Sequence, residues 1–495
     1  MTAAAFNILI IGAGNVNFGN VEDHEARKVR PAISPPRQVC SFKYRKLGDR
    51  LNVVGLVDPD VKRARIRLDE KVGAGIHGYK DTKVFPSIKE AGSGLSTSET
   101  PQMGLLGIQP TYRGSTAPGK DAELEVKRYF PGIAIFVEKP ISSSPLSEVQ
   151  AVCSQLEGTI SSVGYMLRYL DAVTTMRNLI TENKLTIMSS IATYFMAYEF
   201  GGTDARARGG YFDTRVELGP IVGQATHIVD LCRFLCGEVD LSSVAAAVVE
   251  RWETPGNLSR SLYEDHIPEE FSIPRITNAL WKWENGATGM LVHAVALHDG
   301  LYETELTILA DGWKLKLVDL YGTPRLQVRR PGSDVQEETV FNNDDPFFSE
   351  ISCFIDVVEG KSGSQVVRSS YADAIKTYEL VSLFQASLGR RLRFGLDLGD
   401  SSGWRSLVGK VPEGRSTFGV IAPAFHGRPN LDSGSGWRSL LRHVRAGSYT
   451  YVKLGAACYE TASVPFTLSN PKTKPTGVMR TSIIQLIVRR PKPLG

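Results

Sequence analysis

Lys139 is the first residue whose chemistry and setting suggest a reactive site. It lies in the run Glu138-Lys139-Pro140, which closes the apolar segment Ile133–Val137. A short apolar run of this kind is typical of a buried strand, so the lysine should emerge at the carboxyl edge of a sheet. An ammonium group there could hydrogen-bond a hydroxyl or carbonyl oxygen and polarise it, and desolvation could lower its pKa usefully. The alternative interpretation is an ordinary solvated surface lysine.

His227 is the second candidate, because a neutral imidazole can accept a proton. It lies in the segment Pro220–Cys236, whose apolar residues recur at helical spacing and which ends on Gly237. Asp230 follows three residues later and therefore shares a helix face with His227. The imidazole could take the proton of an alcohol while a hydride leaves the same carbon. The alternative interpretation is a histidine that packs in the core.

A glycine turn near the N-terminus predicts a dinucleotide site. The run Gly12-Ala13-Gly14-Asn15-Val16-Asn17 directly follows the apolar run Ile8–Ile11. Between a strand and a helix, such glycines let the backbone approach a pyrophosphate at the N-terminus of the helix. We therefore expect Gly12, Gly14 and Asn15 to line the site, although a tight turn before any helix is the alternative. Asn17 replaces the third glycine, so close helix packing cannot be assumed there.

Asp58 ends the next apolar run, Val53–Val57, and supports the same interpretation. A carboxylate at this point accepts hydrogen bonds from the adenosine ribose hydroxyls of a dinucleotide. Lys62 and Arg63 follow closely enough to meet a 2′-phosphate, so both NAD and NADP remain candidate cofactors. Taken alone, an aspartate at a strand end is also a common turn residue.

Apolar runs alternate with helix-like segments in the first part of the chain and predict a parallel sheet. The runs are rich in Ile, Val and Leu, as strands buried on both faces should be, and Asp121–Tyr129 is a predicted crossover helix. The predicted strands are Asn7–Gly12, Leu51–Asp58, Met103–Pro110 and Ile133–Pro140. We therefore expect an α/β fold with an N-terminal Rossmann domain at residues 5–150. The long spacing from Gly12 to Asp58 predicts an insertion at about residues 20–40.

Alternation of apolar and polar residues later in the chain predicts antiparallel strands with one covered face. The predicted strands include Trp281 and Trp283, Thr288–Leu297, Glu303–Ala310 and Trp313–Leu320, and a helix at Tyr371–Leu388 follows. We expect a second α/β domain with an open, predominantly antiparallel sheet at residues 151–395. Residues 396–495 are rich in Gly, Ser and Arg with weak periodicity, and we expect them to form an appended tail.

The composition narrows the classes of partner. The net charge is only +4 over 495 residues and the basic residues are dispersed, which argues against nucleic acid. The N-terminal apolar run is too short for a membrane span or signal peptide. The six cysteines are widely spaced, which predicts reduced thiols and not a disulfide framework. We expect a cytoplasmic protein with a small-molecule substrate and no membrane partner. No metal is expected, because neither Cys232 with Cys236 nor His293 with His298 has further ligands nearby.

These features together resemble the Gfo/Idh/MocA oxidoreductases, the family of glucose-fructose oxidoreductase and inositol dehydrogenase, and more closely a branch common in fungi. Four matches occur in order: the turn at Gly12, Asp58, Glu138-Lys139-Pro140, and Thr226–Asp230 within the predicted helix. The run Val163–Tyr169 also looks like the family's first strand of the second domain.

The resemblance implies an oxidoreductase that uses NAD or NADP to interconvert an alcohol and a carbonyl. The substrate would be a sugar, a cyclic polyol or a secondary-metabolite intermediate. Lys139 and His227 would flank the nicotinamide and the reacting carbon. Members of the family often assemble through the open sheet face, so a homo-oligomer is expected. The further residues expected around the cofactor are Gln109, Pro110 and Glu138, and those expected in the substrate pocket are Tyr165, Arg168, Tyr198 and Asp213.

Gly223 is the main departure from the family. Members usually carry an acidic residue four positions before the histidine, where a carboxylate would orient the imidazole and stabilise its protonated form. Asp213 and Glu217 are the candidates to replace it from the preceding loop. The missing acid keeps a second hypothesis open, in which the chain is a non-catalytic dinucleotide-binding sensor or regulatory protein.

Overall fold

The computed structural model describes residues 4–18, 45–198, 212–215, 218–259, 264–298 and 302–389 of the 495-residue chain. The predicted insertion at residues 20–40 and the predicted tail at residues 396–495 lie outside these ranges. Within the described ranges, none of the helices combines the length and the hydropathy that crossing a membrane requires.

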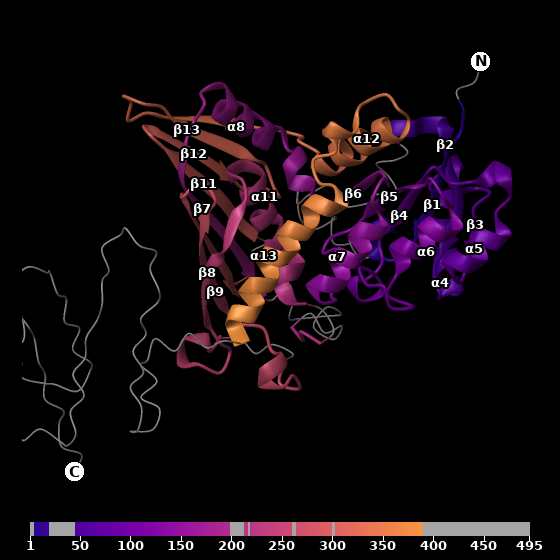
Figure 1. Ribbon diagram of the computed structural model, residues 1–495, viewed down its shortest axis with the longest axis horizontal. Helices are drawn as coiled ribbons and strands as arrows, with labels where there is room; N and C mark the ends of the chain where they lie inside the picture. Colours follow the sequence, from indigo (N-terminus) through magenta and orange to yellow (C-terminus); the bar gives the residue numbers. More distant parts are fainter. Residues whose placement is uncertain are drawn as a thin grey trace, which may run out of the picture. The chain divides into compact units, whose positions relative to one another are not determined.

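The first sheet is a parallel, six-stranded sheet with the strand order β3-β2-β1-β4-β5-β6 (Figure 1). This is the order of a Rossmann fold, with its topological switch point between β1 and β4. The predicted N-terminal Rossmann domain is therefore confirmed. The strands are β1 Phe6–Ile11, β2 Leu51–Val57, β3 Lys83–Phe85, β4 Met103–Leu106, β5 Ala134–Val137 and β6 Ser161–Val163.

Helices join these strands and cover the sheet, because its central strands are apolar on both faces. Strands β4 and β5 are buried at every residue. A short helix, α1 Asn15–Phe18, follows β1. The longer crossover helices are α4 Val61–Gly73, α5 Ile88–Gly94, α6 Ala122–Tyr129 and α7 Leu146–Gln155. The predicted crossover helix over Asp121–Tyr129 corresponds to α6.

The run Val163–Tyr169 does not form the first strand of the second sheet, which corrects that expectation. Strand β6 ends at Val163 and pairs with β5 in the first sheet, and the 3-10 helix η5 Met166–Tyr169 follows. The sequence of a strand does not show which sheet it joins, because this depends on which strand lies beside it in the folded protein. Residue 150 falls inside α7, so the first sheet continues beyond it.

The second sheet has eight strands in the order β14-β13-β12-β11-β7-β10-β9-β8. All neighbours pair antiparallel except β7 and β10, which are parallel. This confirms the predicted open, mostly antiparallel α/β domain. The strands are β7 Ile187–Ala197, β8 Val239–Val249, β9 Ile276–Trp283, β10 Thr288–Leu297, β11 Tyr302–Ala310, β12 Trp313–Val318, β13 Arg325–Arg329 and β14 Gln336–Val340.

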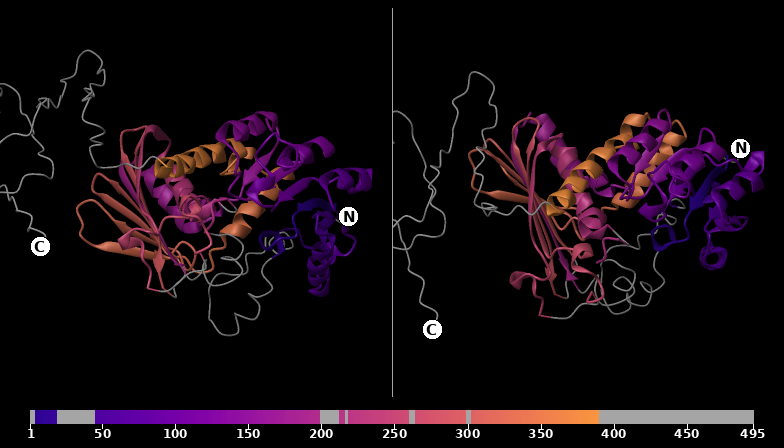
Figure 2. Two further views of the ribbon diagram at one scale, coloured as in Figure 1. Left: turned by 90° about the horizontal axis from the view of Figure 1, so that it is seen from below. Right: turned by 60° about the horizontal axis from the view of Figure 1, so that its bottom comes forward.

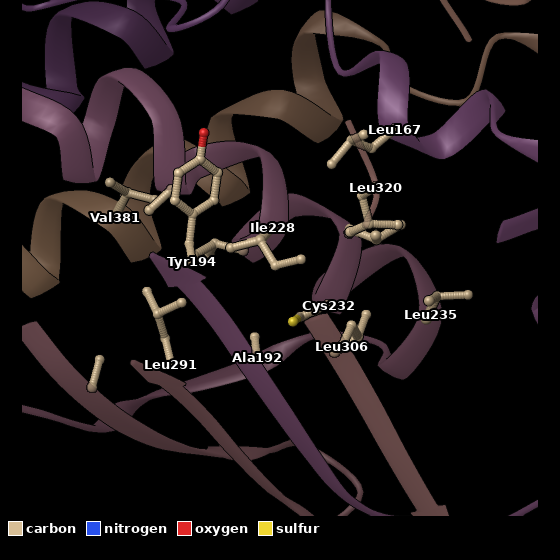
Figure 3. Packing of buried hydrophobic residues seen from close by; sticks show 14 of the residues in the cluster. Leu167, Ala192, Tyr194, Ile228, Cys232, Leu235, Leu291, Leu306, Leu320 and Val381 are labelled. Carbon is tan, nitrogen blue, oxygen red and sulfur yellow. The ribbon is translucent and has the colours of Figure 1, made fainter. Parts of the chain in front are cut away.

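One face of the second sheet is covered by α8 Asp171–Glu182, α11 Thr226–Cys236 and α13 Tyr371–Gly389 (Figures 1 and 2). Alternate residues of the strands point toward these helices, which explains the alternation in the sequence. In Figure 3, Ala192 and Leu291 from neighbouring strands face Ile228 and Cys232 of α11, and all four are fully buried.

The chain returns to the first sheet after completing the second. Helix α12 Pro346–Val358 places Phe354 against Phe136 of β5, with ring centroids 5.8 Å apart. Helix α13 contributes Tyr371 and Tyr378 to the core of the first sheet, whereas its later residues Val381 and Phe384 join the core of the second. Residues 346–389 therefore hold both sheets in one compact unit.

His293 on the inner face of β10 gives the fold a specific pH dependence. Its ring stacks on Tyr194 with centroids 5.7 Å apart, and burial lowers the pKa of His293 to about 3. The unfolded chain takes up a proton at this histidine below about pH 6.5, whereas the folded protein does not. The free energy of unfolding should therefore fall as the pH drops below this value, by roughly 1.4 kcal/mol per pH unit.

The contribution of His293 is isolated by comparing the wild type with His293→Phe in urea unfolding at several pH values. As the pH falls from about 6.5 to 4.5, we expect the wild type to lose unfolding free energy that His293→Phe retains. The control variant is His77→Gln, because His77 is exposed and should leave the pH dependence unchanged. Parallel pH profiles for the wild type and His293→Phe would show that the buried imidazole is not responsible.

Candidate functional site

The glycine turn after β1 has the backbone that a close ligand approach needs. Gly12 has φ +97°, and an added Cβ would lie 2.9 Å from the carbonyl oxygen of Gly107 after β4. Any other residue would therefore be both strained and crowded at this position. Around Gly14, by contrast, the Gly107 oxygen at 4.0 Å is the only atom of the described residues that an added Cβ would meet. The turn is thus tight beneath Gly12 and open above Gly14, while Asn15 begins α1.

Asn17 occupies the position of the missing third glycine without opening the turn. Its side chain is fully buried and donates from Nδ2 to the carbonyl oxygens of Gly12 at 2.7 Å and Ile11 at 3.2 Å. An added Cβ on Gly107 would lie 2.5 Å from this amide, so a glycine at residue 107 makes room for it. Gly107 thus provides the space that the Asn17 side chain needs in place of the third glycine of the motif.

Asp58 lies beside the glycine turn, as predicted, and its carboxylate already has several donors. It is 2% exposed and accepts hydrogen bonds from the backbone N–H of Ala13 at 2.7 Å and of Asp60 at 2.9 Å. Arg63 contacts both carboxylate oxygens, at 2.7 and 2.8 Å. The same edge of the sheet therefore presents a carboxylate together with a half-exposed guanidinium.

Lys139 emerges at the end of β5 and reaches an element of the second domain. Its Nζ donates a hydrogen bond of 2.6 Å to the carbonyl oxygen of Gly223. Gln109 and Pro110 were predicted to end the adjacent strand, but β4 ends at Leu106 and these residues begin the 3-10 helix η4 Pro110–Tyr112. The buried Arg113 donates to the carbonyl oxygens of Glu138 and Ile108 and thereby ties the ends of β5 and β4 together.

The turn that contacts Lys139 is a π-helix, η6 Ile221–Ala225, which leads directly into α11. A π turn shifts carbonyl groups away from the regular helical ladder and often marks a functional site. Gly223 lies within it, where the resemblance predicts an acid, and no atom of the described residues comes within 4 Å of an added Cβ at this position. The lysine therefore contacts a backbone carbonyl at the position where the resemblance predicts a side-chain carboxylate.

His227 lies in the first turn of α11, four residues after Gly223. It is 6% exposed, and its ring meets Tyr165 and Tyr321 edge-on at centroid distances of 6.0 and 6.1 Å. The Tyr165 hydroxyl hydrogen-bonds Thr226 Oγ1 at 2.9 Å. The structure thus brings Tyr165 and His227 together, and it brings Lys139 to the π turn that precedes His227.

The other predicted pocket residues have different surroundings. Arg168 lies in a buried ion network with Asp230 and Asp373, at 2.6 Å from each. The hydroxyl of Tyr198 hydrogen-bonds Nε2 of His298 at 2.9 Å. Arg168 and Tyr198 are therefore each bound to other side chains of the protein.

Asp213, a candidate replacement for the missing acid, is paired with a cation of its own. Its carboxylate accepts hydrogen bonds from Arg215 at 2.9 and 2.5 Å, and these bonds lower the pKa of Asp213. The second candidate, Glu217, lies outside the described residues.

An aromatic cluster beside His227 was missed in the sequence. Tyr194, Tyr302 and Tyr321 pack with mutual centroid distances of 5.4 to 5.9 Å. Gln224 of the π turn donates from Nε2 to the Tyr302 hydroxyl at 3.2 Å. Alternation along β7 and β11 places Tyr194 and Tyr302 on defined faces, whereas Tyr321 follows β12, and only the packing of these segments brings the three rings together.

Comparison with known proteins gives matches over most of the chain. The family model described as "Putative oxidoreductase C terminal domain" matches residues 168–313. An uncharacterized protein of Schizosaccharomyces pombe is 35% identical over 386 residues, which cover 76% of this chain and 96% of that relative.

Two solved structures show the same fold. The WlbA dehydrogenase from Bordetella pertussis, in complex with NADH and UDP-GlcNAcA, has a TM-score of 0.53 and 16% identity, covering 78% of this chain and 97% of its own. A super-repressor mutant of Gal80p from Saccharomyces cerevisiae has a TM-score of 0.56 and 12% identity, with the same coverage of 78% and 97%.

Proposed function

We propose that this chain, which belongs to the Gfo/Idh/MocA family of oxidoreductases, uses NAD or NADP to interconvert an alcohol and a carbonyl. The substrate class that we propose is a sugar, a cyclic polyol or a secondary-metabolite intermediate. The hydrogen bond from Lys139 to Gly223 carries the proposal, because it joins the strand end of one sheet to the turn before His227. The WlbA structure, which shares this fold, holds NADH and a nucleotide sugar.

The residues at the switch point fit a dinucleotide. In the described part of the chain an added Cβ on Gly14 would come no closer than 4.0 Å to another atom, and Gly12 lets the backbone approach closely. Asp58 and Arg63 would receive the adenosine ribose or its 2′-phosphate at the end of β2. The proposed residues around the cofactor are Gly12, Gly14, Asn15, Asp58, Gln109, Pro110, Glu138 and Lys139.

Lys139 and His227 would carry the proton chemistry. The nicotinamide supplies a hydride acceptor or donor when bound. The Lys139 ammonium would donate a hydrogen bond to the substrate oxygen while retaining Gly223, since an ammonium has three donors. His227 would accept the hydroxyl proton during oxidation and return it during reduction. The edges of Tyr165 and Tyr321 would hold the imidazole ring in place.

The decisive experiment is a screen of sugars and polyols with both nicotinamide cofactors, followed through nicotinamide absorbance. We expect substrate-dependent turnover with at least one member of the panel. Cofactor binding without turnover across the whole panel would instead favour a non-catalytic dinucleotide-binding sensor or regulatory protein. Gly223 in place of the usual acid and the fold shared with a Gal80p super-repressor mutant support that second candidate.

Gly223→Asp should raise turnover if the missing acid limits proton transfer. The substitution meets no steric obstacle in the described part of the chain, where no atom comes within 4 Å of an added Cβ. A carboxylate one turn before His227 would stabilise the imidazolium. General acid–base catalysis contributes roughly 10²–10⁴-fold to a rate, and restoring the acid should recover up to about tenfold of this in kcat. Gly223→Asn is the matched control, since it adds similar volume without charge. An equal kcat for the wild type and Gly223→Asp would contradict this explanation.

We also propose that residues 151–395 form the substrate and oligomerisation domain of a cytoplasmic homo-oligomer, with residues 396–495 as an appendage. Leu280 is 54% exposed on β9 and pairs in register with Met290, which pairs with Ile191 of β7. This row lies on the face opposite to the buried Trp281.

Leu280→Glu should convert the oligomer to a monomer in light scattering, because a charge on a buried interface is strongly unfavourable. The control is Ile66→Glu, a substitution of an exposed residue on α4, away from the second sheet. A monomeric wild type, or an unchanged mass for Leu280→Glu, would contradict the proposed interface.

A further inference from the structure

Glu350 is a buried acid that the proposed chemistry does not use. It lies on α12, which packs against η5, and it is 2% exposed. Among the described residues, no hydrogen-bond donor reaches its Oε1 oxygen. A buried carboxylate with an oxygen that lacks a donor is costly, because the protein interior does not replace the hydration of the charge.

The carboxyl groups of Glu350 and Glu138 approach consecutive residues of the chain. An added Cβ on Gly164 would lie 3.0 Å from Oε2 of Glu138, so the Glu138 carboxyl group rests against this backbone. The backbone of the next residue, Tyr165, faces the Glu350 carboxyl group and acts to lower the pKa of Glu350, although burial outweighs this effect. Glu350 and Glu138 therefore approach the same stretch of backbone at Gly164 and Tyr165, although they come from α12 and from the end of β5.

The charges around Glu350 favour its neutral form. Burial raises the pKa of Glu350 well above its usual value, and the charges of Glu138 and Asp230 raise it further. Arg168 is the nearby cation, but its guanidinium is held by Asp230 and Asp373. The other titratable groups that face this site are Tyr169 on η5 and Cys353 on α12.

We propose that Glu350 is a positioning residue that remains protonated and donates a hydrogen bond to the carboxylate of Glu138. Its hydroxyl hydrogen then lies between the two acids, since two adjacent carboxylates cannot both be ionised in a buried site. The bond holds the end of β5 from behind, while Arg113 holds the carbonyl oxygen of Glu138. Glu350 thereby fixes the direction in which the next residue, Lys139, leaves the strand. Its effect on catalysis rests on the proposed function.

The protonation state is tested without any assay of activity. Urea unfolding of the wild type is compared with Glu350→Gln, which keeps the shape and a hydrogen-bond donor but cannot ionise. If folded Glu350 keeps its proton, the folding equilibrium of the wild type should fall relative to the variant by about tenfold per pH unit above pH 4.5. Glu90→Gln, at an exposed position, is the control and should show no such trend. Parallel profiles for Glu350→Gln and the wild type would overturn the proposal.

The positioning role is tested by Glu350→Met, which fills similar volume but cannot donate a hydrogen bond. We expect Glu350→Gln to retain the wild-type kcat and Glu350→Met to lower kcat about tenfold with little change in KM. Equal kcat values for the two variants would overturn the positioning role. If the wild type has no turnover and binds neither NADH nor NADPH, the proposed function fails, and the unfolding experiment still decides whether Glu350 is protonated.

Discussion

Replacing Lys139 with methionine should lower kcat about 10²–10⁴-fold, the range typical for loss of a proton-handling side chain. Methionine is unbranched and of similar length, so packing around the end of β5 is retained. What is lost is the ammonium that contacts Gly223 and would polarise the substrate oxygen. Because the proposed pyrophosphate contacts are at Gly12 and Gly14, the Kd for the cofactor should change by only a few fold. Steady-state nicotinamide absorbance and calorimetric titration measure the two effects separately.

Lys127→Met is the matched control for this substitution. Lys127 on α6 also donates to a backbone carbonyl, that of Gln155, at the same distance of 2.6 Å. It lies on a crossover helix and not at a strand end, so its loss should leave kcat unchanged. If Lys139→Met retained wild-type turnover, the proton chemistry assigned to Lys139 would be wrong.

Replacing Arg168 with methionine should reduce the free energy of unfolding by about 3–5 kcal/mol, because it leaves a buried carboxylate without its cation. Arg168 donates to both oxygens of Asp230 at 2.6 Å, and Asp230 is 1% exposed. Asp230 is on α11, so the same loss should also loosen the helix that carries His227. Urea unfolding monitored by circular dichroism measures the change.

Two variants distinguish the ion pair from simple packing. Arg177→Met is the control, because Arg177 lies over the ring of Phe234 at 4.5 Å, much as Arg168 does at 5.0 Å. It should cost less than about 1 kcal/mol, as substitutions away from buried networks usually do. The double variant Arg168→Met with Asp230→Leu should recover part of the lost stability, since it removes both buried charges together. A double variant no more stable than Arg168→Met alone would contradict the ion-pair explanation.

Much of the fold could be predicted from the sequence because it depends on local patterns. The apolar runs that end at Ile11, Val57 and Val137 are strands in the structure, and Gly237 ends α11 as expected. The alternation over Thr288–Leu297 gives the bounds of β10. These features follow from the preferences of neighbouring residues and from periodicity, which are properties of short segments.

The site could be predicted only in part. Lys139 and Asp58 lie at strand ends, so a correct strand prediction also locates them. Arg168 was placed in the pocket by resemblance, whereas its partners Asp230 and Asp373 come from two other helices. Glu350 and Tyr194 carried no motif at all. Such residues acquire their surroundings from segments far away in the chain, which no local pattern describes.

The sequence by itself therefore determined the two α/β domains, the glycine turn and the strand end that carries Lys139. Only the tertiary structure decided what Lys139 contacts. It showed that a π turn directs the carbonyl of Gly223 toward the ammonium in place of the usual carboxylate. It also showed that α12 and α13 return to the first sheet. The physical reason is that strand and helix preferences act between near neighbours, whereas ion pairing and core packing act between segments that meet only after folding.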